Sequence, residues 1–221
     1  MQTVLITGTN RGIGLELVRH HSKRGDNVIA VCRESSLELE ETGVKVIDGI
    51  DMSDEKAIKT IGNHLDNVSI DRVIANAGLR GVEEYGRLDF ESLRYQYEVN
   101  ALGPLRLVQT LSDSLGFGAK VVLISTKVAS LKDNESGGEF GYRMSKAALN
   151  MAGVNLAHEL KPRNIAVFLL HPGYVRTDLT GGEGIINADE SATSLMATAD
   201  RLGINETGCF WHASWDEEIP W

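Results

Sequence analysis

Short apolar runs alternate along the chain with longer stretches in which apolar residues recur at helical spacing. Six of the apolar runs have the length and composition of strands that are buried on both faces: 4–6, 28–32, 44–47, 72–75, 121–124 and 166–170. Patterns typical of helices occupy 13–24, 35–41, 53–65, 89–115 and 141–160, with Ser53 as the N-cap of the third. This alternation predicts an α/β fold, in which a parallel sheet is covered by helices on both faces and ligands bind beyond the carboxyl ends of the strands.

The composition is that of an ordinary globular chain. With 221 residues, 42% of them hydrophobic and 24% charged, residues 1–221 are expected to form a single domain. The net charge of −9 argues against nucleic acid or an anionic membrane as the main partner, although a local basic pocket for a phosphate is still permitted. No apolar run approaches the length of a membrane span, and the N-terminus has no basic or long apolar leader, which predicts a cytoplasmic location.

A glycine-rich turn, residues 7–14, joins the first predicted strand to the first predicted helix. At such a junction the free backbone N–H groups and the helix dipole attract an anion, and glycines let the backbone come close to it. The spacing is G-x-x-x-G-x-G, which matches the commonest dinucleotide-binding fingerprint, G-x-G-x-x-G, only in part. The turn alone therefore fits a nucleotide site or a tight strand-to-helix connection.

The end of the second strand bears on the choice of nucleotide. An acidic residue there would accept hydrogen bonds from the ribose 2′-hydroxyl of NAD, but Cys32 and Arg33 occupy the position. Arg33 and Arg11, which lies in the glycine-rich turn, could converge on a 2′-phosphate, which favours NADP(H) over NAD(H). Glu34 opposes this interpretation if the strand ends one residue later, and either arginine could be a solvated surface charge.

Three residues that disfavour helix interiors interrupt the segment 89–115, namely Asn100, Gly103 and Pro104. Pro104 has no N–H to donate, so the carbonyl of the residue four positions earlier, Asn100, is left free for another donor. An ordered water bound there would extend a proton relay beside a catalytic lysine; the alternative is a kink that fits the helix around the core.

Tyr142 and Lys146 lie four residues apart in a predicted helix, so their side chains face the same way. An ammonium group held close to a phenol favours the phenolate. We therefore expect Lys146 to lower the pKa of Tyr142 from its usual value of about 10 and to make it a usable acid and base. Taken alone, the pair could also be two unrelated surface residues.

In their order along the chain, these motifs resemble the short-chain dehydrogenase/reductase family over nearly the whole length. The matching segments are the turn at 7–14 (T-G-x-x-x-G-x-G), Asp51, Asn76-Ala77-Gly78, Asn100, Tyr142 with Lys146 (Y-x-x-x-K), and Pro172 to Thr177 (P-G-x-V-x-T). The ending Glu218 to Trp221, the short length and the insertion before Tyr142 resemble the subgroup of C-factor and sniffer-type carbonyl reductases. The resemblance implies a Rossmann-type, doubly wound fold and an oxidoreductase that interconverts a carbonyl and an alcohol.

The resemblance also implies a role for each matching residue. Tyr142 is expected to be the general acid and base, Lys146 to bind the nicotinamide ribose, Asn100 to anchor a water of the proton relay, and Thr126 to hold the substrate oxygen. The expected cofactor-binding residues are Gly8, Asn10, Arg11, Gly12, Ile13, Gly14, Arg33, Asp51, Met52, Asn76, Ala77, Gly78, Tyr142, Lys146, Pro172, Gly173, Val175 and Thr177. In this set, Asp51 is expected to contact the adenine ring and Thr177 the nicotinamide carboxamide.

The sequence departs from the family at one catalytic position. A serine is usual after the fifth strand, and Thr126 stands there, with Ser125 as the alternative if the alignment slips by one residue. Threonine keeps the hydroxyl donor, but its extra methyl group restricts the rotamer and crowds the pocket. The alternative to a reductase is therefore a cofactor-binding sensor or signalling protein with little or no turnover.

The substrate is expected to be a small carbonyl compound or alcohol. Three loops rich in glycine, aspartate and asparagine are expected to bind it, at 79–88, 127–140 and 174–188. The cations of these loops could favour an anionic or polar substrate, or could be solvated: Arg80, Lys127 and Lys132.

The remaining histidines and aromatic residues carry less chemistry. His171 receives no role, and no metal site is expected because the histidines lack metal-ligand spacing. Trp211, Trp215 and Trp221 could line the pocket or a subunit contact, and packing is the simpler interpretation. Family resemblance further implies a homodimer or homotetramer, with the helices at 89–115 and 141–160 at the interface.

Overall fold

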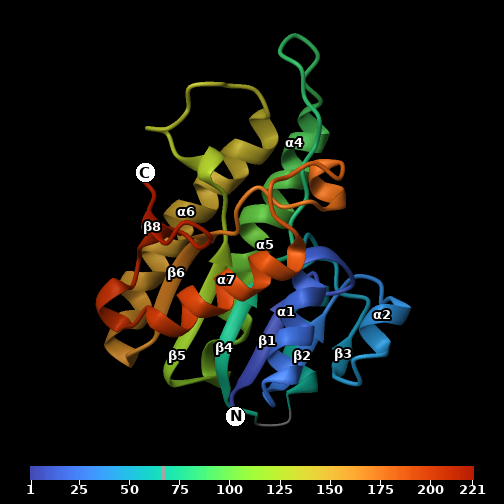
Figure 1. The fold of residues 1–221 in the computed structure, drawn as a ribbon, viewed down its shortest axis with the longest axis vertical. Helices are drawn as coiled ribbons and strands as arrows, with labels where there is room; N and C mark the ends of the chain where they lie inside the picture. Colours follow the sequence, from blue (N-terminus) through green and yellow to red (C-terminus); the bar gives the residue numbers. More distant parts are fainter. Residues whose placement is uncertain (66–67) are drawn as a thin grey trace.

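One eight-stranded sheet runs through the molecule in the order β3-β2-β1-β4-β5-β6-β7-β8 (Figure 1). The computed structural model describes residues 1–65 and 68–221. The strands are β1 (Thr3–Thr7), β2 (Asn27–Val31), β3 (Lys45–Ile47), β4 (Ile70–Ala75), β5 (Leu115–Ile124), β6 (Ala166–His171), β7 (Phe210–His212) and β8 (Glu217–Glu218). Neighbouring strands are parallel, and only β8 runs antiparallel to its neighbour among the described strands.

Helices cover both faces of this sheet, which confirms the predicted doubly wound α/β fold. They are α1 (Gly12–Lys23), α2 (Leu37–Glu40), α3 (Glu55–Thr60), α4 (Phe90–Tyr97), α5 (Gly103–Thr110), α6 (Phe140–Leu160) and α7 (Ala188–Arg201). Helices α1 and α7 pack together, and α3 with α5 and α4 with α6 pack together. None of the helices in the described residues is long and apolar enough to cross a membrane.

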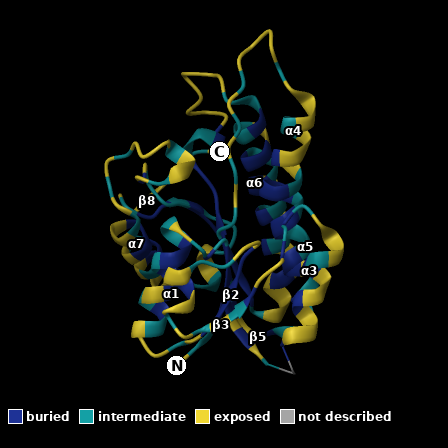
Figure 2. Cartoon of the chain, turned by 90° about the vertical axis from the view of Figure 1, so that its right-hand side faces the viewer, coloured by how far each residue is buried: buried dark blue, intermediate teal, exposed yellow. Residues whose placement is uncertain are grey.

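Two hydrophobic clusters fill the space between the sheet and its helices. Successive residues of β1 point to opposite faces, so Val4 and Ile6 join the cluster that contains Leu15 and Leu195 of α1 and α7, whereas Leu5 joins the other. Figure 2 shows the result as buried strands between helices whose outer faces are exposed. Apolar burial on both faces explains why the strands are almost continuously hydrophobic in sequence.

The order of the strands places a binding site. From β1 the chain proceeds outward to β2 and β3, and then returns to β4 on the other side of β1. The two halves therefore diverge between β1 and β4, and in such sheets ligands bind in the crevice beyond the carboxyl ends of the strands at that point.

Some elements differ from the sequence prediction. The helix expected at 89–115 is broken by a π-helix, Glu98–Leu102, and a 3-10 turn, Ser112–Ser114, and β5 already begins at Leu115. The N-cap of α3 is Asp54 rather than Ser53, because the Asp54 carboxylate accepts the N–H groups of the first helical turn. The prediction also missed α7, β7 and β8, because the buried face of α7 consists largely of small residues such as Ser191, Ala192 and Ala199 and the two strands are very short.

Candidate active site

A cavity of about 670 Å³ opens at the carboxyl ends of β1, β2 and β4. The predicted cofactor-binding residues that line it are Gly8, Asn10, Arg11, Gly12, Ile13, Gly14, Arg33, Asp51, Met52, Asn76, Ala77, Gly78, Tyr142, Lys146, Pro172 and Thr177. Gly173 and Val175 line a second, neighbouring cavity instead. Segments far apart in the sequence thus meet around one space, as the fold predicts.

The glycine-rich turn is packed too tightly for side chains. A Cβ on Gly14 would lie 2.0 Å from the carbonyl oxygen of Gly8, which itself has a φ of 71°. The Asn76 amide donates to the carbonyls of Thr7 and Gly8 at 3.0 and 3.1 Å, and the N–H of Ala77 donates to the Thr7 hydroxyl. These bonds fix the turn against the segment that follows β4.

The first turn of α1 faces this cavity without a capping side chain. Arg11 occupies the N-cap position, and its backbone is extended there, with φ at −163°. Uncapped N–H groups at a helix N-terminus are a ready site for a phosphate. The turn therefore supplies backbone donors, and the cavity beside it is large enough for a nucleotide.

The far end of the cavity holds a polar cluster around Asp51. The Tyr95 hydroxyl donates to Asp51 at 3.3 Å, Arg33 lies 3.9 Å from the same carboxylate, and Ser53 donates through both its N–H and its hydroxyl. Burial opposes ionisation of Asp51, but the hydrogen bonds from Ser53 and Tyr95 and the charge of Arg33 outweigh it and lower the pKa. Asp51 is therefore an anion that faces the cavity.

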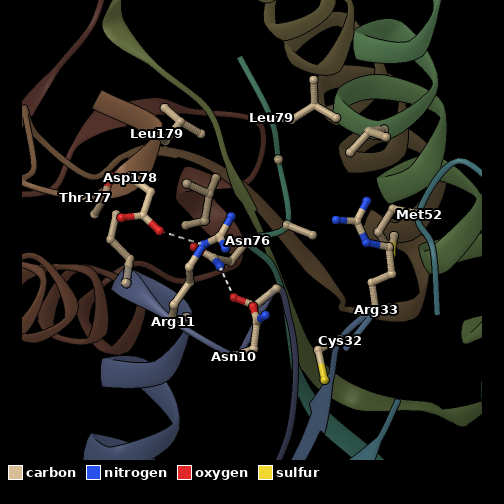
Figure 3. Close-up of a pocket in the computed structure, with 18 of the residues that line it drawn as sticks. Asn10, Arg11, Cys32, Arg33, Met52, Asn76, Leu79, Thr177, Asp178 and Leu179 are labelled. Atoms are coloured by element: carbon tan, nitrogen blue, oxygen red, sulfur yellow. Dashed lines mark hydrogen bonds and ion pairs between the residues drawn. The ribbon is translucent and has the colours of Figure 1, made fainter. Parts of the chain in front are cut away.

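The two arginines of the predicted phosphate site do not converge. Figure 3 shows Arg11 beside Asp178 on one side of the cavity and Arg33 near Met52 on the other. The Arg11 guanidinium lies 3.2 Å from the Asp178 carboxylate, and both side chains are largely exposed. The expectation that the two arginines converge is therefore wrong. Of the two, only Arg33 lies at the end of β2.

Asn100 lies in the π-helix, where the N–H of Gly103 donates to the carbonyl of Glu98, five residues earlier. The missing N–H of Pro104 is the local cause, and such bulges are frequent at functional sites. The side chain of Asn100 is buried, accepts the N–H of Leu79 at 2.9 Å, and donates to the Leu79 carbonyl and the Ser145 hydroxyl at 2.8 and 3.0 Å. Its amide therefore holds the segment after β4 against α6.

The loop that follows is tied down in the same way. The N–H of Gly81 donates to the amide oxygen of the fully buried Gln96, at 2.9 Å. Glu83 accepts a hydrogen bond from the Gln96 amide and another from the N–H of Gly141, at the start of α6. Residues 79–83 are thus fastened to α4 and to the helix that carries Tyr142.

Lys146 is buried at the inner wall of the cavity, where its Nζ donates to the carbonyl of Ile124 at 2.7 Å. Burial lowers the pKa of Lys146 to about 8. Burial likewise raises the pKa of Tyr142 to about 12, against a hydrogen bond with Thr126 and the charge of Arg80 that lower it. The expectation that Lys146 lowers the pKa of Tyr142 is therefore wrong for the chain alone, and Tyr142 is a protonated phenol at neutral pH.

The structure distinguishes the two hydroxyl residues that follow β5. The Ser125 hydroxyl is buried and donates to the Asn150 side chain at 2.6 Å. Thr126, in contrast, lies near enough to Tyr142 to lower the pKa of the phenol. Both residues line the second cavity, and because the Ser125 hydroxyl is engaged by Asn150, Thr126 stays the predicted second hydroxyl beside Tyr142.

A second cavity of about 390 Å³ adjoins the first, and Tyr142 lines both. Its walls include parts of all three predicted loops, with apolar side chains such as Val128, Ile185 and Ile186. Of the three candidate cations, Arg80 and Lys127 line it and Lys132 does not. Arg80 is paired with Glu139, and Lys127 lies 3.6 Å from Asp133, so each charge is already compensated.

Sequence reasoning missed three of four further residues that line this second cavity, and left a pocket role open for the fourth, Trp215. His171, His212, Ser214 and Trp215 line it from the end of β6 and from the turn after β7. Trp211 and Trp221 pack elsewhere, as expected. The available signal was the aromatic-rich C-terminal segment, but the sequence alone does not tell which of its residues reach a pocket.

One group of potential metal-binding side chains lies in the described residues, at the surface between α1 and α7. It consists of Glu16, His20 and Asp189, and the His20 ring is 2.7 Å from the Asp189 carboxylate. The hydrogen bond between His20 and Asp189 accounts for the proximity of these two side chains, and the absence of a metal site stays a prediction.

Comparison with known proteins identifies the family. Residues 2–184 match the family described as short chain dehydrogenase. The chain is 38% identical over 219 residues to 1-hydroxy-2-glutathionyl-2-methyl-3-butene dehydrogenase of Rhodococcus sp. (strain AD45), covering 96% of this chain and 97% of the relative. It is 36% identical over 155 residues to C-signal of Myxococcus xanthus, covering 69% of this chain and 93% of that protein.

A solved structure shows the same fold. The NADPH-bound carbonyl reductase from chicken fatty liver superposes with a TM-score of 0.89 at 25% identity, covering 100% of this chain and 99% of that one. The matches to C-signal and to this reductase support the predicted resemblance to the C-factor and sniffer-type subgroup. The chain belongs to the short-chain dehydrogenase family of oxidoreductases.

Proposed function

We propose that the chain is an NADP(H)-dependent oxidoreductase that reduces a carbonyl to an alcohol, or the reverse, with Tyr142 as the general acid and base. The observation that carries the proposal is the position of Tyr142 where the two cavities meet. Thr126 stands beside it on the side of the second cavity, and Lys146 lines the first. A cofactor in the first cavity and a substrate in the second would both touch the phenol.

In the proposed reduction, each of the residues around Tyr142 has a separate role. Bound NADPH would supply a hydride to the carbonyl carbon. Because Tyr142 is protonated at neutral pH, it can give its proton to the carbonyl oxygen as negative charge develops there, while the Thr126 hydroxyl donates a second hydrogen bond. Lys146 would bind the ribose hydroxyls, and the Asn100 carbonyl, left without the N–H of Pro104, would hold a water that returns the proton to Tyr142.

The preference for NADP(H) rests on the charge at the end of β2. Arg33 reaches into the cavity from there, and an acid at Cys32 or Arg33 that would favour NAD(H) is absent. The NADPH-bound reductase of the same fold supports this choice. Titration with NADPH and NADH separately tests it, and an equal or higher affinity for NADH would contradict it.

Activity is tested with the preferred cofactor on a panel of aldehydes and ketones. Tyr142→Phe is expected to lower kcat by about 10²–10⁴-fold, the usual contribution of a general acid. Cofactor affinity should change little, because backbone groups and other side chains line most of the cavity. Tyr97→Phe, at an exposed tyrosine of α4, is the matched control and should behave as the wild type.

A second candidate function is a cofactor-binding sensor or signalling protein. The match to C-signal and the threonine at position 126 favour it. Tyr142→Phe discriminates between the two, because it removes the activity of a reductase and leaves the output of a sensor intact. Absence of turnover in the wild type over the whole panel, with activity restored in Thr126→Ser, would favour the sensor.

A homodimer or homotetramer remains part of the proposal. Exposed apolar residues on α4 and α6, such as Phe90, Tyr97, Met144 and Met151, support an interface on these two helices. Sedimentation that showed only monomer at micromolar concentration would contradict it.

A further inference from the structure

His171, the last residue of β6, lines the second cavity with a polar group that the protein does not use. Its Nδ1 is buried and has no hydrogen-bond partner in the described residues. Almost all buried polar side-chain atoms of folded proteins have such a partner, so an unpaired one beside a cavity calls for an explanation. Because His171 lines the cavity, its imidazole can offer a hydrogen bond to a ligand there.

Aromatic packing holds the His171 ring in place. The ring meets His212 edge-on, with centroids 4.5 Å apart and an interplanar angle of 83°. His212 stacks in turn on Trp215 at 4.1 Å, and the Lys127 ammonium lies 5.3 Å from the centroid of the Trp215 ring. The four residues form one layer along the cavity wall, so His171 is positioned without needing a hydrogen bond of its own.

One nitrogen of His212 is already engaged, whereas the buried Nδ1 of His171 has no partner in the described residues. The backbone N–H of Trp215 donates to His212 Nδ1 at 3.2 Å, so a neutral His212 carries its proton on Nε2. Burial, and then the charges of His212 and Lys127, lower the pKa of His171 to about 3. His171 is therefore neutral at physiological pH and offers one donor nitrogen and one acceptor nitrogen.

The lining of the rest of the second cavity bears on how the His171 imidazole would act on specificity. Thr126 and Tyr142 lie on the wall of the same cavity, and much of the lining is apolar, as at Ile185 and Ile186. A polar group in an otherwise apolar pocket fixes the orientation of a ligand. It also discriminates strongly, because a ligand that lacks the matching group leaves it unpaired.

We propose that His171 determines substrate specificity by hydrogen bonding to a second oxygen of the substrate, a hydroxyl or a carbonyl, while Thr126 and Tyr142 hold the reacting oxygen. The substrate class is thus a hydroxyketone or a dicarbonyl compound with a compact apolar body. This proposal rests on the proposed function, since it names the substrate class of the same site.

Matched pairs of substrates test it. The hydroxycyclohexanones and methylcyclohexanones substituted at positions 2, 3 and 4 differ only in whether the substituent can hydrogen bond. For the wild type we expect kcat/KM to favour the hydroxyl compound by about tenfold at one ring position, the size of one hydrogen bond. His171→Phe keeps a flat ring against His212 and should abolish this preference, whereas His171→Asn, which keeps a donor and an acceptor, should retain part of it.

Controls separate this proposal from the proposed function. His158→Asn, at an exposed histidine of α6, should keep the wild-type preference. Calorimetric titration of the same pairs measures binding without turnover. A protein that binds NADPH but reduces no substrate would contradict the proposed function. The binding preference measured by titration would still test the role of His171 in that case. If circular dichroism shows that His171→Phe is unfolded, His171→Leu replaces it under the same criteria.

Either of two results overturns the proposal. One is a wild type that shows no hydroxyl preference at any ring position, in turnover or in binding. The other is a folded His171→Phe or His171→Leu variant that keeps the full wild-type preference.

Discussion

The two cavities that meet at Tyr142 are built in different ways. The first is shaped by backbone in short turns, where the Asn76 amide fastens the glycine-rich turn and a Cβ on Gly14 would collide with Gly8. The second is shaped by side chains on longer loops, such as Ile185 and Trp215, many of them partly exposed. A binding site made of backbone tolerates few substitutions, whereas one made of side chains can change its ligand without a change of fold.

The largest expected effect on cofactor binding follows from disturbing the backbone of the first cavity. In Gly14→Ala the new Cβ would lie 2.0 Å from the Gly8 carbonyl oxygen and 2.7 Å from the Asn76 amide nitrogen, so the turn must shift. We expect the dissociation constant for the cofactor to rise by about 100-fold, because small displacements of a binding group are that costly. Gly62→Ala, whose Cβ would find its nearest neighbour at 4.0 Å, is the control. Equal cofactor affinities in the two variants would contradict the view that close backbone contacts shape the first cavity.

The next effect concerns the buried ammonium group of Lys146, which lines the first cavity. Because burial lowers the pKa of Lys146 to about 8 in the folded state, the unfolded chain binds more protons between pH 8 and its own pKa of about 10.4. Stability from this group therefore rises with pH through that window, and below pH 8 the buried charge costs about 3 kcal/mol. Lys146→Met should raise the free energy of unfolding by up to that amount at pH 7.

Urea unfolding at several pH values measures this difference. The gain in stability of Lys146→Met over the wild type should shrink between pH 8 and about 10.4 and then vanish. A difference that does not depend on pH would mean that packing, and not the charge, distinguishes the two proteins. The loss of activity in the same variant would show that the charge is kept for binding and not for stability.

The smallest effect is expected from a conservative change in the second cavity. Thr126→Ser keeps the hydroxyl beside Tyr142 and removes one methyl group, so kcat/KM should stay within about threefold of the wild type. Thr126→Val has a similar shape but no hydroxyl, and should lower kcat by about 10²-fold, as the loss of one donor to a developing oxyanion does. Steady-state kinetics with one ketone decides the matter. A large gain in Thr126→Ser would show that the methyl group crowds the reacting carbonyl.

The sequence predicted the first cavity better than the second for a physical reason. The glycine-rich turn and Asn76 are constrained by close backbone contacts, which admit few residue types and so leave a recognisable pattern. His171 and His212 meet only through the pairing of β6 with β7, a contact between distant segments that no local pattern records.

Other errors have equally specific causes. The π-helix at Asn100 was anticipated only as a kink, because a missing N–H shows where a helix is disturbed and not which hydrogen bonds replace the lost one. The pKa of Tyr142 depends on how deeply the phenol is buried and on whether the Lys146 ammonium finds another acceptor, which it does at Ile124. Neither quantity can be obtained from a four-residue spacing.

The hydrogen bonds that hold residues 79–83 in place bear on which wall of the second cavity can move. Leu79, Gly81 and Glu83 are hydrogen bonded to Asn100 of the π-helix, Gln96 of α4 and Gly141 of α6, so this segment is held to the helix that carries Tyr142. The opposite segment, 174–188, is closed mainly on itself, as where the N–H of Ile185 donates to the Tyr174 carbonyl. We therefore expect adaptation to bulkier molecules to be one-sided, with displacement of the segment 174–188 and little change around Tyr142.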